Sequence, residues 1–217
     1  MVSFIRRFKG LEAPALATRM YAIDPNGDFE QWAEVQPTYL EMTGDIAPRS
    51  FRGYDGVGRY ENHTGRNEFQ TLKVAVDREK VYFYVACTAP ITAPSKENWM
   101  SLYLKCSEEA KPNWEGYQFA INRIAPDGQS ALVERANRDG EYSWETIGHA
   151  QIRVEGHEMM LAVERRLLGL CGDSVTLEFK WSDHMQALDV MDFYQNGDAA
   201  PRGRMNYLFK TSDALQC

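Results

Sequence analysis

The segment EFQTLKVAVDREKVYFYVA, residues 68–86, decides the fold class of this chain. Its first half, Glu68–Val76, alternates polar and apolar side chains, and its second half, Val81–Ala86, is a β-branched and aromatic run. The short polar link Asp77–Lys80 between them has the length and composition of a tight turn. Two such runs joined by a turn predict a β-hairpin. We therefore expect a scaffold of antiparallel strands.

Strand-like segments continue on both sides of this hairpin. One precedes it at 38–42, and others follow at 100–105, 116–123, 131–135, 150–154, 158–163 and 175–181. Glu155–His157 lies between two of them and predicts a second hairpin. The only clear helical candidate in the second half of the chain is Glu164–Gly169, and total helix is expected to stay below about 15%.

These segments predict an all-β molecule with about ten strands and one or two short helices. The expected architecture is a single antiparallel β-sandwich of immunoglobulin-like or jelly-roll-like type. Residues 1–20 are expected to form a lead-in and residues 21–217 the single domain. No internal repeat or domain boundary is visible in the sequence.

A long connection follows the strand-like run Thr176–Trp181. It lies within FKWSDHMQALDVMDFYQNGDAAPRGRMNYLF, residues 179–209, and leads to a second run at Met205–Phe209. Connections of this length in compact domains are typically functional or disordered, and this one is too aromatic for disorder. Because it holds no catalytic signature, it favours a binding loop on a β scaffold.

Composition excludes several classes of function. The 217 residues carry a net charge of −7, which disfavours nucleic acid and other polyanionic partners. No apolar run reaches the roughly 18 residues of a membrane-spanning helix, so no membrane insertion is expected. The N-terminal segment lacks the apolar core of a signal peptide, so the chain is expected to be cytoplasmic or exported by a signal outside this sequence.

No reactive centre is indicated either. The cysteines Cys87, Cys106, Cys171 and Cys217 lack the spacing of a zinc site and are too few for a disulfide scaffold. No Gly-x-Ser-x-Gly elbow, phosphate loop or His-Glu-x-x-His motif occurs. The 31 acidic residues single out no catalytic pair. We expect a protein that is not an enzyme.

Four segments together resemble the carbohydrate-binding module family 9-like (DOMON-like) domains. The opening motif Ile-Asp-x-x-Gly-Asp-Phe-x-x-Trp occupies Ile23–Trp32, and the hairpin motif occupies Lys73–Asp77 with Val81–Val85. Asn113–Arg123 and Trp181–Pro201 are similar as well. The resemblance runs from about position 23 to the end of the chain, and its first two motifs are shared by many sandwiches.

The resemblance implies a β-sandwich that binds a poly- or oligosaccharide without catalysis. Such domains are often appended to extracellular polysaccharide-degrading enzymes, so other domains of a larger glycoside hydrolase and an extracytoplasmic location are implied too. The alternative is a structural or spacer module with no ligand of its own. Some related domains hold haem through methionine and histidine. Here His184 and Met185 are adjacent, so on a strand they would point to opposite faces, and haem is not expected.

Flat aromatic side chains beside polar groups suit a sugar ring. Trp99 and Trp114 each stand beside an asparagine in a polar, turn-like context, and Tyr194 lies on the aspartate-rich connection. We predict Trp99, Trp114, Tyr194 and Asn113 as carbohydrate-binding residues. The alternative for each tryptophan is packing in the core, where this residue type is highly buried on average.

The same connection is rich in oxygen ligands. Asp183, Asp189, Asp192 and Asp198 are predicted as metal ligands, with Ca²⁺ as the ion that carboxylates and carbonyls favour. Caps, turns and solvated loop positions explain the same aspartates. A second oxygen-rich group at Asp24, Asn26 and Asp28 is equally explained by a turn.

Overall fold

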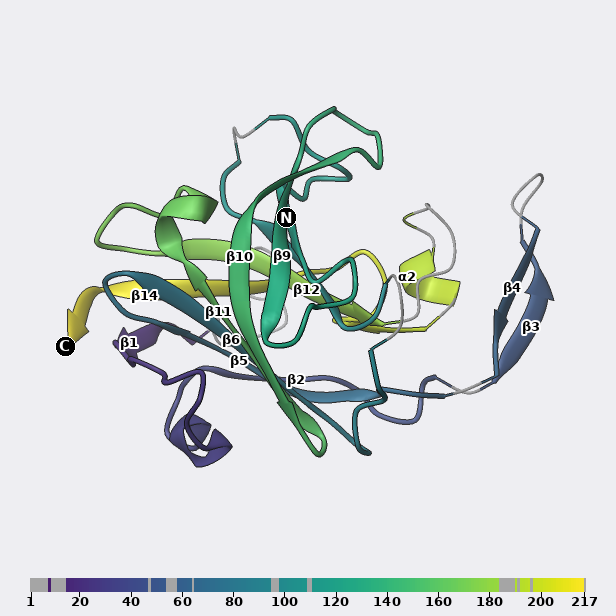
Figure 1. Cartoon of the computed structure of the whole chain (residues 1–217), viewed down its shortest axis with the longest axis horizontal. Coiled ribbons are helices and arrows are strands. Elements are labelled where there is room, and N and C mark those ends of the chain that lie inside the picture. The colour runs from purple at the N-terminus through teal and green to yellow at the C-terminus, as the bar shows by residue number, and fades with distance from the viewer. Residues whose placement is uncertain are drawn as a thin grey trace.

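The protein is all-β, and its strands form one large curled sheet (Figure 1). The computed structural model describes residues 8, 15–46, 48–53, 58–63, 65–94, 98–108, 111–183, 190, 192–195 and 197–216. Strand accounts for 47% and helix for 6%, so the predicted fold class and low helix content are confirmed. None of the helices in these ranges is both long and apolar enough to cross a membrane.

The large sheet has twelve strands in the order β1-β14-β12-β7-β8-β9-β10-β11-β6-β5-β2, with β13 paired to β12. Every pair is antiparallel except β1 with β14. The strands are β1 (Ala17–Arg19), β2 (Thr38–Leu40), β5 (Phe69–Val76), β6 (Lys80–Cys87), β7 (Ser101–Lys105), β8 (Phe119–Ile121), β9 (Ser130–Ala136), β10 (Trp144–Glu155), β11 (Glu158–Glu164), β12 (Thr176–Asp183), β13 (Asp198–Ala200) and β14 (Tyr207–Gln216).

The hairpin predicted at residues 68–86 is β5–β6, which pairs Val76 with Val81 and Val74 with Phe83. Because successive side chains of a strand point to opposite faces, Val74, Val76, Val81 and Phe83 all face the interior. They belong to the main core, a cluster of about thirty buried apolar residues between the layers of the curled sheet. The second predicted hairpin, β10–β11, is confirmed with Glu155 opposite Glu158.

Tyrosines join the two ends of the sheet. Tyr39 in β2 donates its hydroxyl to Leu208 O of β14 at 2.9 Å, and the Tyr207 hydroxyl in β14 has two acceptors, Glu41 Oε2 at 2.6 Å and Leu40 O at 2.9 Å. The two rings lie 5.1 Å apart, and the Tyr39 ring meets Phe179 of β12 edge-on at 5.0 Å. The sheet thus curls until β2, at one end, contacts β14, the strand next to β1 at the other end, through side chains.

Two smaller apolar clusters cover outer faces of the sheet. The first packs the 3-10 helix η1 (Phe29–Trp32) against β6 and β11 through Trp32, Tyr84 and Met160. The second packs the short helix α2 (Asp192–Gln195) and the turn around Trp114 against β7 and β8 through Phe193 and Tyr103. Both segments lie on the outside of the sheet and restrict its solvent-exposed surface.

Several elements differ from the expectation. The lead-in contributes β1, and two further strands, β3 (Arg49–Arg52) and β4 (Arg59–Asn62), pair as a separate ribbon, which Figure 1 shows apart from the large sheet. The long connection after β12 is not only a loop, because its residues 198–200 pair with β12 as β13. The helical candidate at 164–169 is the 3-10 helix η2 (Arg165–Leu168).

Candidate functional site

The two tryptophans predicted to stack on sugar are buried in different clusters. Trp99 is 1% exposed in the main core, and its Nε1 donates to Thr92 O at 3.1 Å. Trp114 is 3% exposed and packs among Tyr103, Tyr117 and Phe193 on an outer face. Neither indole presents a face to a ligand, because burying its large apolar area stabilises the fold. The structure thus places both predicted sugar-binding tryptophans in apolar clusters, which is the packing alternative for each.

The other two predicted sugar contacts do not complete that site. The Asn113 side chain holds its own turn, since its Oδ1 accepts from Gly116 N at 2.9 Å and its Nδ2 donates to Asp139 at 3.4 Å. Tyr194 belongs to α2, but its side chain lies outside the described residues. The polar context that suggested these positions is the chemistry of a turn.

The predicted metal ligands are bound by protein groups where they are described. Asp183 pairs with Arg66 Nε at 2.9 Å and accepts from Met100 N at 3.0 Å. Asp198, its neighbour across β12 and β13, accepts from Phe69 N at 2.6 Å. Asp192 is buried in α2, and Asp189 lies outside the described residues.

Burial raises the pKa of both Asp183 and Asp198, to about 7 for Asp198, and the Arg66 guanidinium opposes the shift at Asp183. Across the described ranges, no group of three or more histidine, cysteine, aspartate or glutamate side chains is placed to hold a metal ion. Asp189 lies outside these ranges, so the calcium site at the four aspartates stays a prediction. At the second oxygen-rich group, Asp24 Oδ1 accepts from Asn26 N at 2.9 Å, which is the turn alternative.

A groove of about 810 Å³ lies instead on the outer face of β5, β6 and β11. Its floor follows from strand register, because Glu158, Ala86 and Thr71 stand side by side across the three strands. Ala86 is the smallest of the three, so it leaves a hollow between a carboxylate and a hydroxyl. The next row contains Lys73 and Tyr84, which completes the floor.

One wall of the groove is η1, which begins after Asp28. Lys73 Nζ donates to Trp32 O at 2.6 Å and to Ala33 O at 3.1 Å, so a cation holds the carbonyl end of this helix. Arg153 of β10 donates to Gly27 O at 2.8 Å and places its guanidinium 5.7 Å from the centre of the Phe29 ring. Two long-range contacts therefore fix the wall against the sheet.

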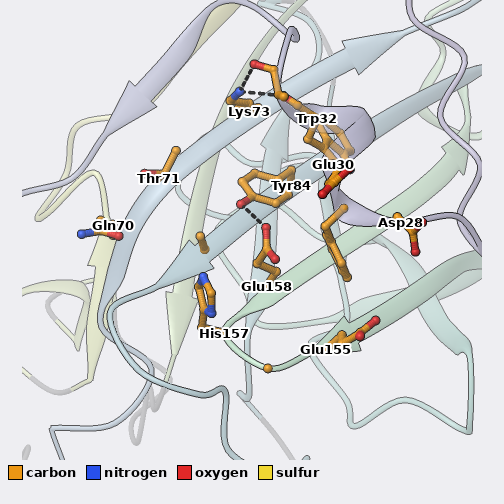
Figure 2. A pocket seen from close by; sticks show the side chains of 14 residues that line it. Asp28, Glu30, Trp32, Gln70, Thr71, Lys73, Tyr84, Glu155, His157 and Glu158 are labelled. Atoms are coloured by element: carbon orange, nitrogen blue, oxygen red, sulfur yellow. Dashed lines mark hydrogen bonds between the residues drawn. The ribbon is translucent and has the colours of Figure 1, made fainter.

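The opposite wall is the tip of the β10–β11 hairpin. Gly156 takes a positive φ of 58°, which the two-residue turn requires and which glycine adopts without strain. This turn presents Glu155, His157 and Glu158 to the groove. Figure 2 shows Gln70 and Thr71 on one side of the central Tyr84–Glu158 pair, and Asp28 and Glu30 on the other.

Aromatic and charged groups alternate around this groove. Trp32 and Tyr84 pack with ring centroids 5.2 Å apart, and the half-buried Phe29 ring lies 6.2 Å from Tyr84. The Tyr84 hydroxyl donates to Glu158 Oε1 at 2.6 Å. Burial raises the pKa of this tyrosine, and the hydrogen bond and charge of Glu158 add to the shift, so its phenol stays a donor.

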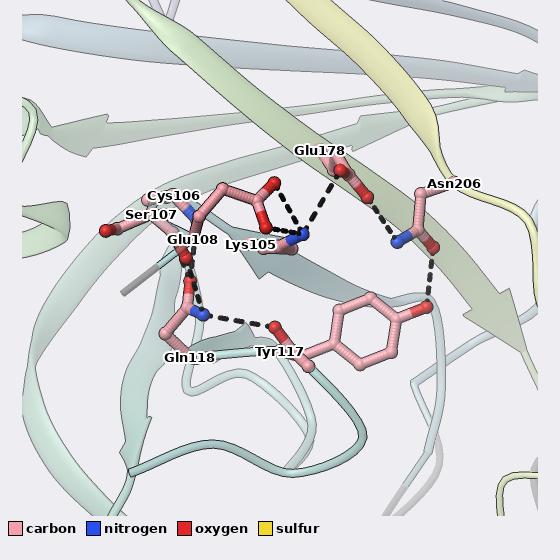
Figure 3. Close-up of polar contacts among 9 residues, drawn as sticks. Lys105, Cys106, Ser107, Glu108, Tyr117, Gln118, Glu178 and Asn206 are labelled. Carbon is pink, nitrogen blue, oxygen red and sulfur yellow. Dashed lines mark hydrogen bonds and ion pairs between the residues drawn. The ribbon is translucent and has the colours of Figure 1, made fainter. Parts of the chain in front are cut away.

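A smaller hollow of about 250 Å³ lies beside Lys105 and Glu178. Figure 3 shows its polar groups bound to one another: Lys105 Nζ lies 2.8 Å from Glu108 and 3.4 Å from Glu178. Asn206 links Glu178 at 2.9 Å to the Tyr117 hydroxyl at 2.7 Å. The hydrogen bond with Glu108 raises the pKa of Lys105. Because these groups satisfy one another, this hollow offers a ligand less than the groove.

The groove was not predicted, although the sequence contains residues that point to it. Thr71, Lys73, Tyr84 and Glu158 are the outward-facing positions of alternating strands, where solvent-exposed polar residues are also usual. The Ile23–Trp32 motif entered the sequence analysis only as part of the family resemblance and not as a wall of a groove. The missing information was which strands become neighbours and what covers them.

Comparison of the chain with protein-family models, with curated proteins and with solved structures found no match in any of the three. The resemblance to family 9-like modules therefore remains a prediction from the sequence.

Proposed function

We propose that this chain is a non-catalytic carbohydrate-binding module and that the groove between η1 and the β10–β11 hairpin is its sugar site. The supporting observation is the half-buried Phe29 ring among carboxylate, amide and hydroxyl groups in an open groove. The CH groups of a pyranose form an apolar patch that packs on an aromatic ring, and its hydroxyls need polar partners at the rim.

The polar lining suits hydroxyl groups in both directions. Gln70 and Thr71 offer donors and acceptors, and the carboxylates of Asp28, Glu30 and Glu155 accept. The volume of about 810 Å³ lies within the range usual for small-ligand sites. Because η1 is already fixed by Lys73 and Arg153, binding requires little ordering of the wall.

The test is calorimetry of Phe29→Ala with an oligosaccharide retained by a glycan array. We expect a loss of about 1–3 kcal/mol of binding free energy, the scale of an aromatic anchor. Phe51→Ala is the matched control, since Phe51 is 41% exposed on β3 and does not line the groove.

Two results contradict the proposal in different ways. Equal affinities of Phe29→Ala and the unsubstituted protein place the sugar site outside this groove. An array that retains no glycan favours the alternative, a structural or spacer module without a ligand.

A further inference from the structure

The groove is acidic. The described residues that line it include four carboxylates, on Asp28, Glu30, Glu155 and Glu158, against a single lysine, Lys73. A ligand in this groove therefore meets an excess of negative charge at short range, where low-dielectric walls strengthen the field.

The nearby cations are engaged in holding the wall. Lys73 Nζ lies within hydrogen-bond distance of two backbone carbonyls of η1 and its C-terminal end. The Arg153 guanidinium binds Gly27 O and pairs with Glu155 at 2.6 Å. An anionic ligand would have to break these contacts before it gained a cationic partner, so uronic-acid and sulfated sugars are disfavoured.

Two of the carboxylates are uncommitted. In the described part of the chain, the side chains of Asp28 and Glu30 make no hydrogen bond or ion pair, and both residues are exposed. They flank Phe29, which the proposed function makes the sugar-stacking ring. The Arg153 guanidinium lies 5.7 Å from the centre of that ring, so a cationic group on a sugar packed there would have to turn away from Arg153 and toward Asp28 or Glu30.

Trp32 packs beneath the Phe29 wall of the groove and offers no polar group to a ligand. It lines the groove and is 2% exposed, and its Nε1 has no hydrogen-bond partner among the described residues. Buried donors are rarely left without a partner. This nitrogen is closed to solvent, so a sugar oxygen in the groove does not reach it, and the charge preference rests on the carboxylates.

We propose that the groove prefers sugars with a free amino group, such as glucosamine oligomers, over neutral sugars, and rejects uronic and sulfated ones. This inference rests on the proposed function. A protonated amine is a compact donor of three hydrogen bonds, and its bonds to carboxylates are charge-assisted. N-acetylation removes the charge but keeps the sugar ring, so it isolates the electrostatic contribution.

The test is titration with three oligosaccharides of one length, built from glucosamine, N-acetylglucosamine and glucuronic acid. We expect the glucosamine oligomer to bind about fivefold more tightly than the acetylated one, the size of a single exposed ion pair. The glucuronic oligomer is expected to bind most weakly. The preference should shrink with added salt and as pH rises through the pKa of the sugar amine.

Matched variants separate the groove from the overall charge of −7. The double variant Asp28→Asn, Glu30→Gln removes two charges from the groove and should abolish the preference. The control Asp173→Asn, Glu115→Gln removes two charges from exposed positions outside the groove and should retain it. Equal loss in both variants means general attraction to an acidic protein and overturns the inference.

The remaining outcomes are distinct. If the acetylated oligomer binds as tightly as the amine, and Phe29→Ala still weakens both, the preference is wrong and the sugar site stands. If none of the three oligomers binds and the array retains no other glycan, the proposed function fails as well.

Discussion

At the scale of single residues, buried carboxyls control the response to pH. Burial raises the pKa of Asp198 from 3.8 to about 7, so its contribution to stability is present below about pH 4 and lost as pH rises through about 7. We expect the free energy of unfolding to fall by up to about 4 kcal/mol across this window. Asp183 adds a change of the same sign.

Urea unfolding at a series of pH values between 4 and 8 measures the slope of the unfolding free energy against pH. Asp198→Asn should flatten it, whereas Asp24→Asn, on an exposed turn, should leave it unchanged. Burial lowers the pKa of Lys180 to about 7, and this shift changes stability only above the window. A slope that Asp198→Asn leaves intact would contradict the assignment.

Single residues were also where sequence reasoning reached least far. Trp99 and Trp114 lie in polar stretches, but the neighbours of a residue in sequence do not show whether its side chain folds inward. Asn98 and Glu115, next to these tryptophans, adopt positive φ, so the chain bends there and returns the indoles to apolar clusters. The polar neighbours belong to the bends.

At the scale of elements, the apolar pattern of each strand was the most reliable signal. Alternation located β5, and continuous apolar runs located β6 and β11, which are buried on both faces, all to within a residue or two. This signal missed β3, whose four residues are exposed or half-buried, and β4, whose sequence RYEN holds one apolar side chain and so carries no apolar pattern. It also missed β13, whose three residues are too few to carry a period.

The helix η1 provides a prediction at this scale. Lys73→Met keeps the apolar stem but removes the donor to Trp32 O and Ala33 O, so the wall should loosen locally. We expect faster hydrogen exchange of amides in residues 29–35, and a loss of stability of about 1–3 kcal/mol. Lys80→Met is a control on the neighbouring strand, because Lys80 Nζ contacts Gln151 and not η1.

Exchange rates in β12 should stay at the rate set by global unfolding in both variants. Equal exchange of residues 29–35 in Lys73→Met and Lys80→Met would show that apolar packing of Trp32 alone holds the helix.

At the scale of the whole molecule, the sequence predicted a β-sandwich but not how its sheet closes. Local patterns determine which residues form strands, whereas strand order depends on contacts between segments far apart in the chain. The join between β2 and β14 links residues about 170 positions apart. Nothing in the short segment Thr38–Leu40 indicates that its tyrosine reaches the last strand.

This closure should be measurable as a coupling between Tyr39 and Tyr207. The Tyr39 phenol donates to Leu208 O, and the Tyr207 phenol donates to Glu41 and Leu40 O at the end of β2. Burial raises the pKa of both, so both remain donors at neutral pH. Tyr39→Phe and Tyr207→Phe should each cost about 1 kcal/mol of stability. Each bond holds β2 and β14 in register and so helps the other bond to form. We therefore expect the stability of the double variant to depart from additivity by about 0.5 kcal/mol or more, the usual scale of coupling between contacting residues. Denaturant unfolding of the four proteins completes the cycle. Strict additivity would mean that core packing closes the sheet and that the two tyrosines act independently of one another.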